Sequence, residues 1–188
     1  MSAQSMKSST QSSTRTRMRV NVLDEWGYST AIHGLSLCYR NASSNMQHVA
    51  KKISNKDEGH NKFLEHIMVS LQVTAPRSWW QQADTYRISS KQSESTMNTI
   101  MRWPLKQGNF VRPIHPPTLE RLRDLQRTKN FRQLKDELPE GYLQTRVWLV
   151  SYKELRRIVK QRHNHRLLEW QLFCRKLALD VQHPEFLS

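Results

Sequence analysis

Two segments rich in apolar residues constrain the fold most, and the first of them alternates. His66 to Thr74 reads HIMVSLQVT, and Pro76 follows it closely. Tyr142 to Ser151 reads YLQTRVWLVS and follows the Pro-Gly break at residues 138–141. Alternation with a period of two is typical of β-strands, and Pro76 cannot donate to a strand ladder. We therefore predict a central strand that Pro76 ends, and a second core strand that leads to Ser151.

The remaining segments predict a further strand and several helices. Met18–Leu23 also alternates and predicts a strand, whereas Arg77–Tyr86 suits either a helix or a bend. Helices are expected at Leu35–Tyr39 after the break at Gly34, at Met46–Ile53, and from Thr118 onward with Leu119, Leu122 and Leu125 on the apolar face.

Two helices are expected near the C-terminus. Ser151 and Glu154 form a capping box that begins the first, and its apolar face carries Leu155, Ile158 and Val159. Arg162 lies one turn further on the same stripe, so its cation needs a partner on the buried side. After an interruption at residues 163–165, the second helix presents Leu168, Leu172, Leu177 and Val181 and ends at His183-Pro184.

Length and composition predict a single domain. The chain has 188 residues, and residues 1–17 are Ser, Thr and Gln with scattered cations, which predicts a flexible tail before a domain at 18–188. No apolar segment approaches the roughly twenty residues that span a bilayer, and there is no secretory signal. We expect a soluble, cytoplasmic protein with no membrane partner.

The net charge of +14 predicts an anionic partner, whether a nucleotide, nucleic acid or another polyanion. The cations of Lys153–Arg166 form the densest basic segment, and most should lie on a solvated helix face. Cys38 and Cys174 have neither CxxC pairing nor suitable histidine spacing, so we expect free thiols in or near the core and no metal site.

The segment Gly59–Ser95 carries the candidate chemistry. No Gly-rich phosphate loop, GxSxG elbow or HExxH motif occurs in the chain. Gln82, Arg87, Ser90 and Ser95 could converge, because an amide can read a pyrimidine edge while a guanidinium and hydroxyls suit phosphate oxygens. The alternative is an ordinary polar loop.

The order of motifs resembles the flavin-dependent thymidylate synthases, the ThyX family. That family shows a GHxSxxEH turn, a strand ending in Ala-Pro, a Gln, and RHR-x7-S. Here Gly59-His60 and Glu65-His66 match the turn, and Ala75-Pro76 and Gln82 follow. Thr85-Tyr86-Arg87 is then followed by seven residues and Ser95. The likeness continues with Ser151, Arg162 and Glu169-Trp170-Gln171 at the family's C-terminal spacings, over most of residues 18–180.

The resemblance implies an α/β (α+β) fold, with a mainly antiparallel sheet flanked by helices. It implies a homotetramer with active sites between subunits, so that Arg162 and Ser95 could come from different chains. It also implies transfer to the 5-position of a deoxyuridine nucleotide, to give dTMP or a modified dUMP. FAD would supply the hydride, and methylenetetrahydrofolate and NADPH would be co-substrates.

The resemblance also implies roles for single residues. Arg162 would be catalytic and would position the pyrimidine or its charge. The residues that would hold dUMP are Gln82, Arg87, Ser90, Ser95, Lys135 and Arg162. The residues that would hold the flavin are His60, Lys62, Tyr86, Arg87, Ser93, Ser151, Lys153 and Arg157.

Several positions depart from the family pattern. Thr85 and Tyr86 replace the first two residues of RHR, and Ser93, Met97, Lys135 and Ser151 replace an acid, two arginines and an asparagine. Two interpretations follow. The chain is a divergent enzyme of the compact type found in bacteriophages, acting in the host cytoplasm, with compensating cations such as Lys62, Lys91 and Arg157. Alternatively, the fold is kept without redox chemistry, and the protein binds nucleotides or nucleic acid, the latter through its basic surface.

Overall fold

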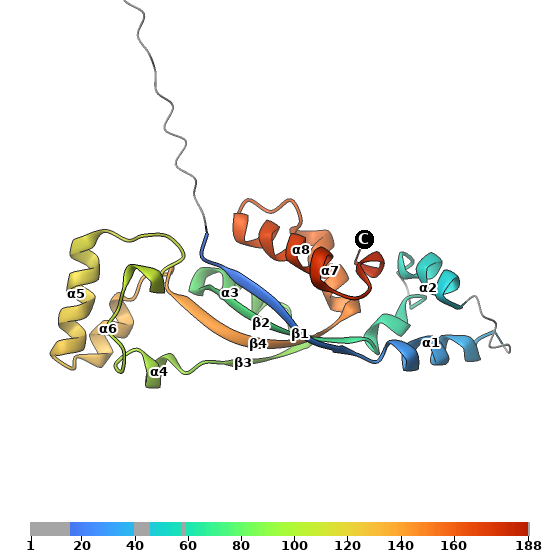
Figure 1. Cartoon of the computed structure of the whole chain (residues 1–188), viewed down its shortest axis with the longest axis horizontal. Coiled ribbons are helices and arrows are strands. Elements are labelled where there is room, and N and C mark those ends of the chain that lie inside the picture. The colour runs from blue at the N-terminus through green and yellow to red at the C-terminus, as the bar shows by residue number, and fades with distance from the viewer. Residues whose placement is uncertain (1–15, 40–45, 58, 188) are drawn as a thin grey trace, which may run out of the picture.

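A computed structural model describes residues 16–39, 46–57 and 59–187, which form one elongated body around a curved antiparallel sheet (Figure 1). Its strands are β1 (Arg19–Trp26), β2 (Met68–Pro76), β3 (Ser89–Ser93) and β4 (Leu143–Ser151), in the spatial order β1-β2-β4-β3. The predicted α+β class with a mainly antiparallel sheet is confirmed. Of the expected tail at residues 1–17, only Thr16 and Arg17 lie within the described residues.

The two predicted core strands form the centre of the sheet. Met68 pairs with Ser151 and Pro76 with Leu143, so β2 and β4 are matched along their whole length. Alternate residues of β2 are fully buried, which explains why the apolar pattern located this strand. The strand predicted at Met18–Leu23 is also confirmed, although β1 continues to Trp26.

The edge strand β3 corrects the expectation of a polar loop. Its sequence SSKQS contains no apolar residue, so no apolar pattern reveals it. Instead, β3 is held in place by antiparallel pairing with β4, in which Ser89 pairs with Val150 and Ser93 with Arg146. The Nζ of Lys91 lies 4.7 Å from the centre of the Trp148 ring and donates to the carbonyl of Tyr86 at 3.1 Å. A short polar edge strand of this kind resists pairing with foreign strands.

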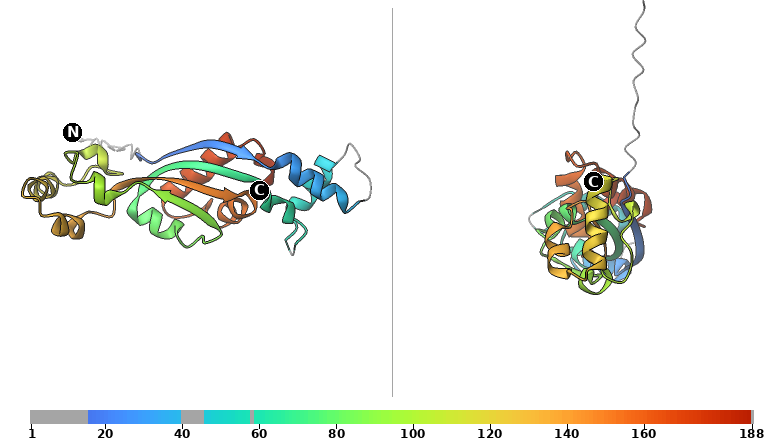
Figure 2. Two further views of the ribbon diagram at one scale, coloured as in Figure 1. Left: turned by 90° about the horizontal axis from the view of Figure 1, so that it is seen from below. Right: turned by 90° about the vertical axis from the view of Figure 1, so that its left-hand side faces the viewer.

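Three helices cover one face of the sheet: α3 (Arg77–Ala83), α7 (Tyr152–Arg162) and α8 (Leu168–Asp180) (Figures 1 and 2). Beneath them Trp79, Trp80, Trp148 and Trp170 are fully buried, with 4.4 Å between the ring centres of Trp79 and Trp170. Large aromatic side chains dominate the free energy of core burial. The middle of the opposite face has no helix over it among the described residues.

Helices also extend the sheet at its two ends (Figure 1). At one end, α1 (Tyr28–Leu37) includes Gly34, so the predicted break there is wrong. That position is exposed, where a helical glycine costs only about 1 kcal/mol. The neighbouring α2 (Met46–Ser54) matches its prediction.

The other end contains α4 (Thr96–Thr99), α5 (Pro116–Arg127) and α6 (Phe131–Glu137) around a separate small core. α5 begins two residues before the expected Thr118, because prolines are tolerated in a first turn. Helix α6 was not predicted, although Asn130 caps it by accepting the N–H of Gln133. Single-turn 3-10 helices η1 (Lys62–Glu65), η2 (Gln107–Asn109) and η3 (Pro184–Phe186) complete the fold.

The two C-terminal helices largely follow the prediction. Leu155 and Ile158 of α7 are fully buried, and the Ser151 hydroxyl accepts the N–H of Glu154 at 3.3 Å. The second half of the expected capping box is wrong, because the Glu154 carboxylate binds Arg157 instead. The assignment of Leu168 to the apolar face of α8 is also wrong, since it is exposed. Within the described residues, no helix combines the length and apolar character needed to cross a bilayer.

Candidate functional site

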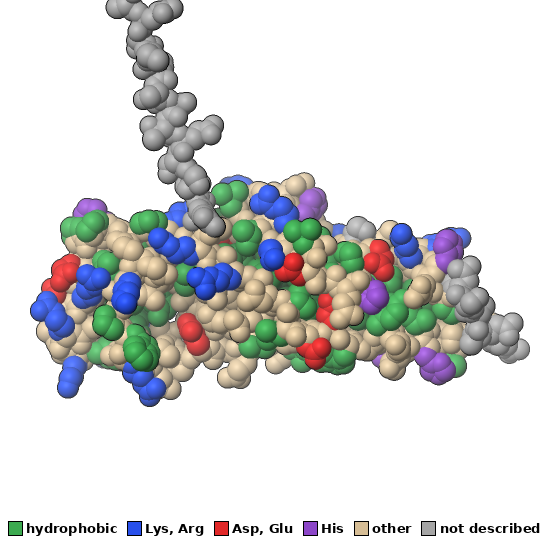
Figure 3. Space-filling model, viewed as in Figure 1, with side chains coloured by type: hydrophobic (Ala, Val, Ile, Leu, Met, Phe, Trp, Pro, Cys, Tyr) green, Lys and Arg blue, Asp and Glu red, His purple; other side chains and the backbone are tan. Residues whose placement is uncertain are grey.

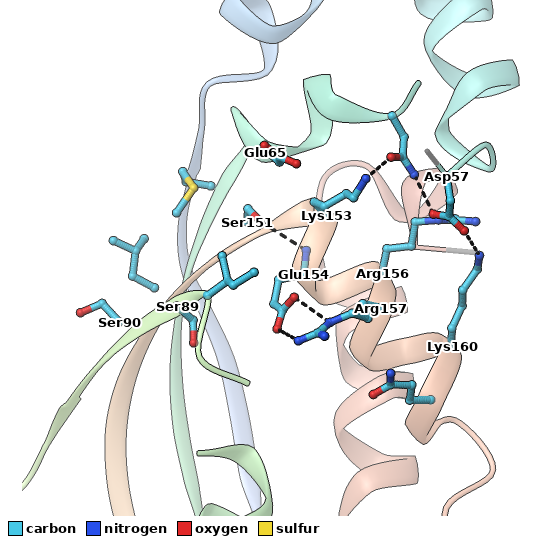
Figure 4. A pocket seen from close by; sticks show the side chains of 15 residues that line it. Asp57, Glu65, Ser89, Ser90, Ser151, Lys153, Glu154, Arg156, Arg157 and Lys160 are labelled. Carbon is cyan, nitrogen blue, oxygen red and sulfur yellow. Dashed lines mark hydrogen bonds and ion pairs between the residues drawn. The ribbon is translucent and has the colours of Figure 1, made fainter. Parts of the chain in front are cut away.

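A pocket of about 810 Å³ lies between β3, η1 and the first half of α7 (Figure 4). Four residues singled out by the sequence line it, namely Ser90, Ser151, Lys153 and Arg157. They come from β3, from the end of β4 and from α7, so the antiparallel pairing of β3 with β4 brings them together. The pocket volume is in the range of small-molecule and cofactor sites.

The capped start of α7 determines which cations reach the pocket. β4 ends and α7 begins at Ser151, whose hydroxyl caps the helix. Four cations then follow on α7 at three- and four-residue spacing, namely Lys153, Arg156, Arg157 and Lys160. All four line the pocket. Three carboxylates, those of Asp57, Glu65 and Glu154, line it as well.

Two of these cations are paired with carboxylates. Arg157 donates to both oxygens of Glu154, at 2.9 and 2.6 Å, and this bidentate pair raises the pKa of Arg157. Lys160 lies 3.5 Å from Asp57. A hydrogen bond from Asn61, and then the charge of Lys160, lower the pKa of the Asp57 carboxyl.

The other two cations form no ion pair within contact distance among the described residues, although the charge of Asp57 acts on both. The Lys153 ammonium donates to the amide oxygen of Asn61, whose own N–H group donates to the Ser54 carbonyl at 3.0 Å. Asn61 is fully buried, so it holds Lys153 in a defined position. Arg156 is only 3% exposed, and within the described part of the chain its side chain makes one hydrogen bond, from Nη1 to the Phe186 carbonyl at 3.4 Å. Burial lowers the pKa of Arg156.

A second polar cluster forms around Arg162 at the end of α7. Its Nε donates to the Tyr86 hydroxyl at 2.8 Å, and that hydroxyl donates to Gln161 at 2.9 Å. The guanidinium carbon lies 5.0 Å from the centre of the Trp170 ring. The predicted need for a partner on the buried side is therefore confirmed, and the partners are a phenol and an indole face.

Trp170 links this cluster to Gln82. Its indole N–H donates to the amide oxygen of Gln82 at 2.9 Å. This bond orients the amide and leaves its NH₂ group available as a donor, with one lone pair on the oxygen already used. Gln82 and Arg162, which are eighty residues apart, thus share one aromatic side chain.

The remaining predicted residues lie outside the pocket lining. Tyr86 is a buried core residue whose hydroxyl holds Arg162, while His60, Lys62, Arg87 and Ser93 are exposed. Ser95 caps α4 by accepting the N–H of Asn98. Lys135 belongs to α6, where burial and then the charge of Arg77 lower its pKa. α6 lies at the end of the molecule far from the pocket (Figure 1).

Comparison with solved structures identifies the fold. A thymidylate synthase X (ThyX) from Helicobacter pylori, solved with FAD and dUMP, superposes with a TM-score of 0.78 over 91% of this chain and 97% of its own. The identity is 18%. A second structure of H. pylori ThyX with FAD and dUMP gives the same TM-score at 17% identity, over 90% of this chain and 98% of its own. The chain has a ThyX-like fold.

Comparison of the sequence alone finds no such relatives. No model of a known protein family matches this chain, and no curated protein matches it either. At 18% identity, the likeness to ThyX establishes the architecture, and the activity has to be argued from the residues of this chain. The expected site residues therefore stay predictions.

Asn61 and Arg156 are two of the pocket residues that were not among the predicted site residues. Asn61 is a lone polar residue in a turn, and nothing in the sequence distinguishes it. Arg156 was grouped with the solvated cations of α7, but it lies one residue after Leu155 and four after Tyr152, both fully buried. Helical spacing therefore placed it on the buried side.

The two cysteines take different positions. Cys174 is buried in α8, as expected, and burial raises the pKa of its thiol to about 11. Cys38 is exposed at the end of α1, so its expected place in or near the core is wrong. Neither lines the pocket. Within the described residues, no three His, Cys, Asp or Glu side chains are grouped to hold a metal ion.

Proposed function

We propose that the protein is a ThyX-like enzyme that binds FAD in the α7 pocket and acts on the 5-position of a deoxyuridine nucleotide. The observation that carries the proposal is the convergence of Ser90, Ser151, Lys153 and Arg157 on one pocket in a chain with a ThyX-like fold. Bound FAD would supply a hydride, with NADPH as reductant and methylenetetrahydrofolate as one-carbon donor. Such a synthase would act in the cytoplasm.

The pocket is chemically suited to a flavin nucleotide. Within the described residues Lys153 and Arg156 form no ion pair at contact distance, so their donors suit phosphate groups. Met68, Ile88 and Leu149 provide apolar surface for a ring. In this proposal Lys153 and Arg157 hold the phosphates, and Ser151, besides capping α7, lies beside the cofactor. His60, Lys62, Arg87 and Ser93 are exposed and would reach the cofactor from another subunit.

The nucleotide would be held by Arg162 and Gln82. The buried phenol of Tyr86 and the indole of Trp170 hold Arg162 in place, so its remaining N–H groups are pre-oriented for an anion or a carbonyl. Ser90, Ser95, Arg87 and Lys135 are the further dUMP ligands of the proposal. Because α6 lies far from α7, we propose that Ser95 and Lys135 act in the site of a neighbouring copy, within a homotetramer.

Flavin binding tests this proposal directly. The protein should bind FAD with the visible absorbance of a protein-bound flavin, and Lys153→Met should weaken that binding about tenfold, because one charge-assisted hydrogen bond is lost. Lys51→Met removes an equal charge from the exposed side of α2 and should leave the affinity unchanged. If the protein shows no absorbance of bound flavin after free FAD has been removed, that result would argue against redox chemistry.

A second candidate function, binding of single-stranded nucleic acid, is favoured by one exposed aromatic residue. Trp103 is 71% exposed between the exposed cations Arg102 and Lys106. Lys and Arg side chains also gather at this end of the molecule (Figure 3). Exposed indoles stack on bases, and nearby cations follow the phosphates. This surface is remote from the α7 pocket and could serve a protein that has lost redox chemistry.

Oligonucleotide binding distinguishes this candidate from the first. A fluorescent oligothymidine should bind about tenfold more weakly when salt rises from about 50 to about 200 mM. Trp103→Ala should weaken the binding about tenfold, while Arg162→Ala leaves it unchanged. Binding that ignores Trp103→Ala would mean that this surface does not hold the strand.

A further inference from the structure

A second pocket, of about 400 Å³, lies between the start of β1, the start of β4 and the segment from α4 to η2, at the opposite end of β4 from α7 (Figure 1). Its lining includes Thr74 of β2 and Thr145 of β4, whose hydroxyl oxygens lie 2.9 Å apart. Strand alternation directs Thr74 away from Val73 and Ala75, which belong to the helix-covered core. The pocket therefore lies on the other face of the sheet, and none of the described residues lines both pockets.

Tyr142 brings a buried hydroxyl to this lining. The residue is 7% exposed, and within the described part of the chain its hydroxyl has no hydrogen-bond partner. Burial, and then the charge of Glu94, raise the pKa of Tyr142, so the phenol is a neutral donor. Glu94 lines the same pocket, and no described residue forms an ion pair with its carboxylate. A buried hydroxyl without a partner is costly, and a ligand that accepts its hydrogen bond removes that cost.

Two guanidinium groups supply positive charge to the pocket. The Nη1 of Arg17 donates to the carbonyls of Gln107 and Phe110 at 3.1 and 3.0 Å, which fixes the side chain. Its Nε and Nη2 have no partner among the described residues and remain available as donors. Arg19 lies opposite Thr74 in the ladder of β1 with β2, and its exposed side chain has no hydrogen bond or ion pair with the described residues. With two guanidinium groups and one carboxylate in its described lining, the pocket favours an anion.

Trp103 gives the pocket a flat aromatic wall. It belongs to the lining although 71% of it is exposed. Gln126 of α5 holds the segment that carries it, because its amide N–H donates to the Trp103 carbonyl at 2.9 Å and its amide oxygen accepts the N–H of Leu105 at 3.1 Å. An exposed indole on a fixed segment is suited to stack on a heteroaromatic base.

We propose that this pocket binds a guanine nucleotide. The base stacks on Trp103, and the phosphate binds Arg19 and the free donors of Arg17. Guanine presents the acceptor O6 beside two donors, N1–H and N2–H₂. The Tyr142 hydroxyl donates to O6, and the two oxygens of the Glu94 carboxylate accept from the two donors.

Other bases match this lining less well. Adenine and cytosine each present a single amino group on that edge, so one carboxylate oxygen of Glu94 would lack a donor. Uracil has one N–H between two carbonyls, which the carboxylate repels. The pocket therefore distinguishes a guanine nucleotide from the deoxyuridine nucleotide of the proposed function.

This site is independent of the flavin and of the dUMP site proposed above. It shares Trp103 with the strand-binding candidate, but it takes a single nucleotide and requires Glu94 and Arg19. The strand-binding candidate instead depends on the cations Arg102 and Lys106 beside Trp103.

Thermal unfolding of the intact protein with GMP, AMP, CMP and guanosine, at constant ionic strength, tests the site. GMP should raise the melting temperature most. Glu94→Gln should weaken GMP binding about tenfold or more and remove the preference for GMP over AMP, because an amide cannot accept from both N–H groups. Arg19→Met should weaken the binding of GMP but not of guanosine, which lacks the phosphate. Glu120→Gln and Arg175→Met remove the same charges from exposed positions outside the pocket and should change neither affinity.

Each result supports or overturns the guanine site. Since Glu94 and Arg19 are exposed, their variants should melt like the wild type without ligand. The absence of a GMP shift, equal shifts with GMP, AMP and CMP, or a GMP shift that survives Glu94→Gln would overturn the site and leave the flavin proposal standing. If Arg162→Ala rather than Glu94→Gln removes the GMP shift, GMP occupies the proposed dUMP site, and the guanine site is wrong. If GMP binds through Glu94 but no flavin binds, the guanine site stands and the flavin proposal fails.

Discussion

Replacing Gly27 by alanine should unfold the protein or lower its free energy of unfolding by about 4 kcal/mol or more. Gly27 joins β1 to α1 with φ of +91°, and a Cβ there would lie 2.0 Å from the carbonyl oxygen of His66. That oxygen belongs to the backbone just before β2, so it cannot move without disturbing the sheet. Van der Waals overlap therefore adds to the cost of the left-handed conformation.

Gly59→Ala is the matched control for this substitution. Gly59 has nearly the same φ, +93°, but a Cβ there would meet no atom within 4 Å. Its cost should be that of the left-handed conformation alone, about 1 to 2 kcal/mol. Denaturation with urea measures both variants. Equal losses would mean that the chain relaxes away from His66 and that the close approach contributes little.

Arg162→Ala should remove between about half and most of the stabilisation that dUMP gives the protein. For the wild type, dUMP at about 100 times its dissociation constant should raise the melting temperature by about 5 °C or more. Arg162 is the cation that Tyr86 and Trp170 hold beside Gln82, so its loss should weaken dUMP binding about tenfold to a hundredfold. Calorimetric titration with dUMP gives the affinity independently of the melting temperature.

Two further variants separate binding from folding in this experiment. Arg166→Ala removes an exposed cation four residues later and should bind dUMP like the wild type. Tyr86→Phe keeps the core ring but removes the hydroxyl that accepts from Arg162, so an intermediate loss is expected. If Arg162→Ala binds dUMP normally, Arg162 is a packing residue, and the nucleotide site lies elsewhere.

The elements that could be predicted from the sequence are those stabilised by contacts between neighbouring residues. β2 alternates strictly, β4 contains the apolar run of residues 147–150, and Ser151 caps α7 through its own hydroxyl, so these elements could be identified from neighbouring residues. β3 could not, because its SSKQS sequence is ordered by pairing with β4 and by Lys91 over Trp148. Such order depends on contacts between residues that are far apart in the chain.

The candidate site divides in the same way. Ser90, Ser151, Lys153 and Arg157 were chosen from the sequence, and one pocket contains all four. Arg156 was missed because charge suggested exposure, whereas its helical position after Leu155 determined burial. Ser95 caps α4 and Lys135 belongs to α6, outside this pocket, so their predicted role depends on the proposed assembly of several copies.

Trp170 gives the protein an internal optical reporter. Its ring packs against Trp79 in the core, its N–H is bonded to Gln82, and the Arg162 guanidinium lies over it. A ligand that draws Arg162 away or rotates the Gln82 amide changes the electric field at the indole. If dUMP binds at Arg162 and Gln82 as proposed, it should shift the contribution of Trp170 to the emission of the six tryptophans, and ligands can then be ranked in solution without a label.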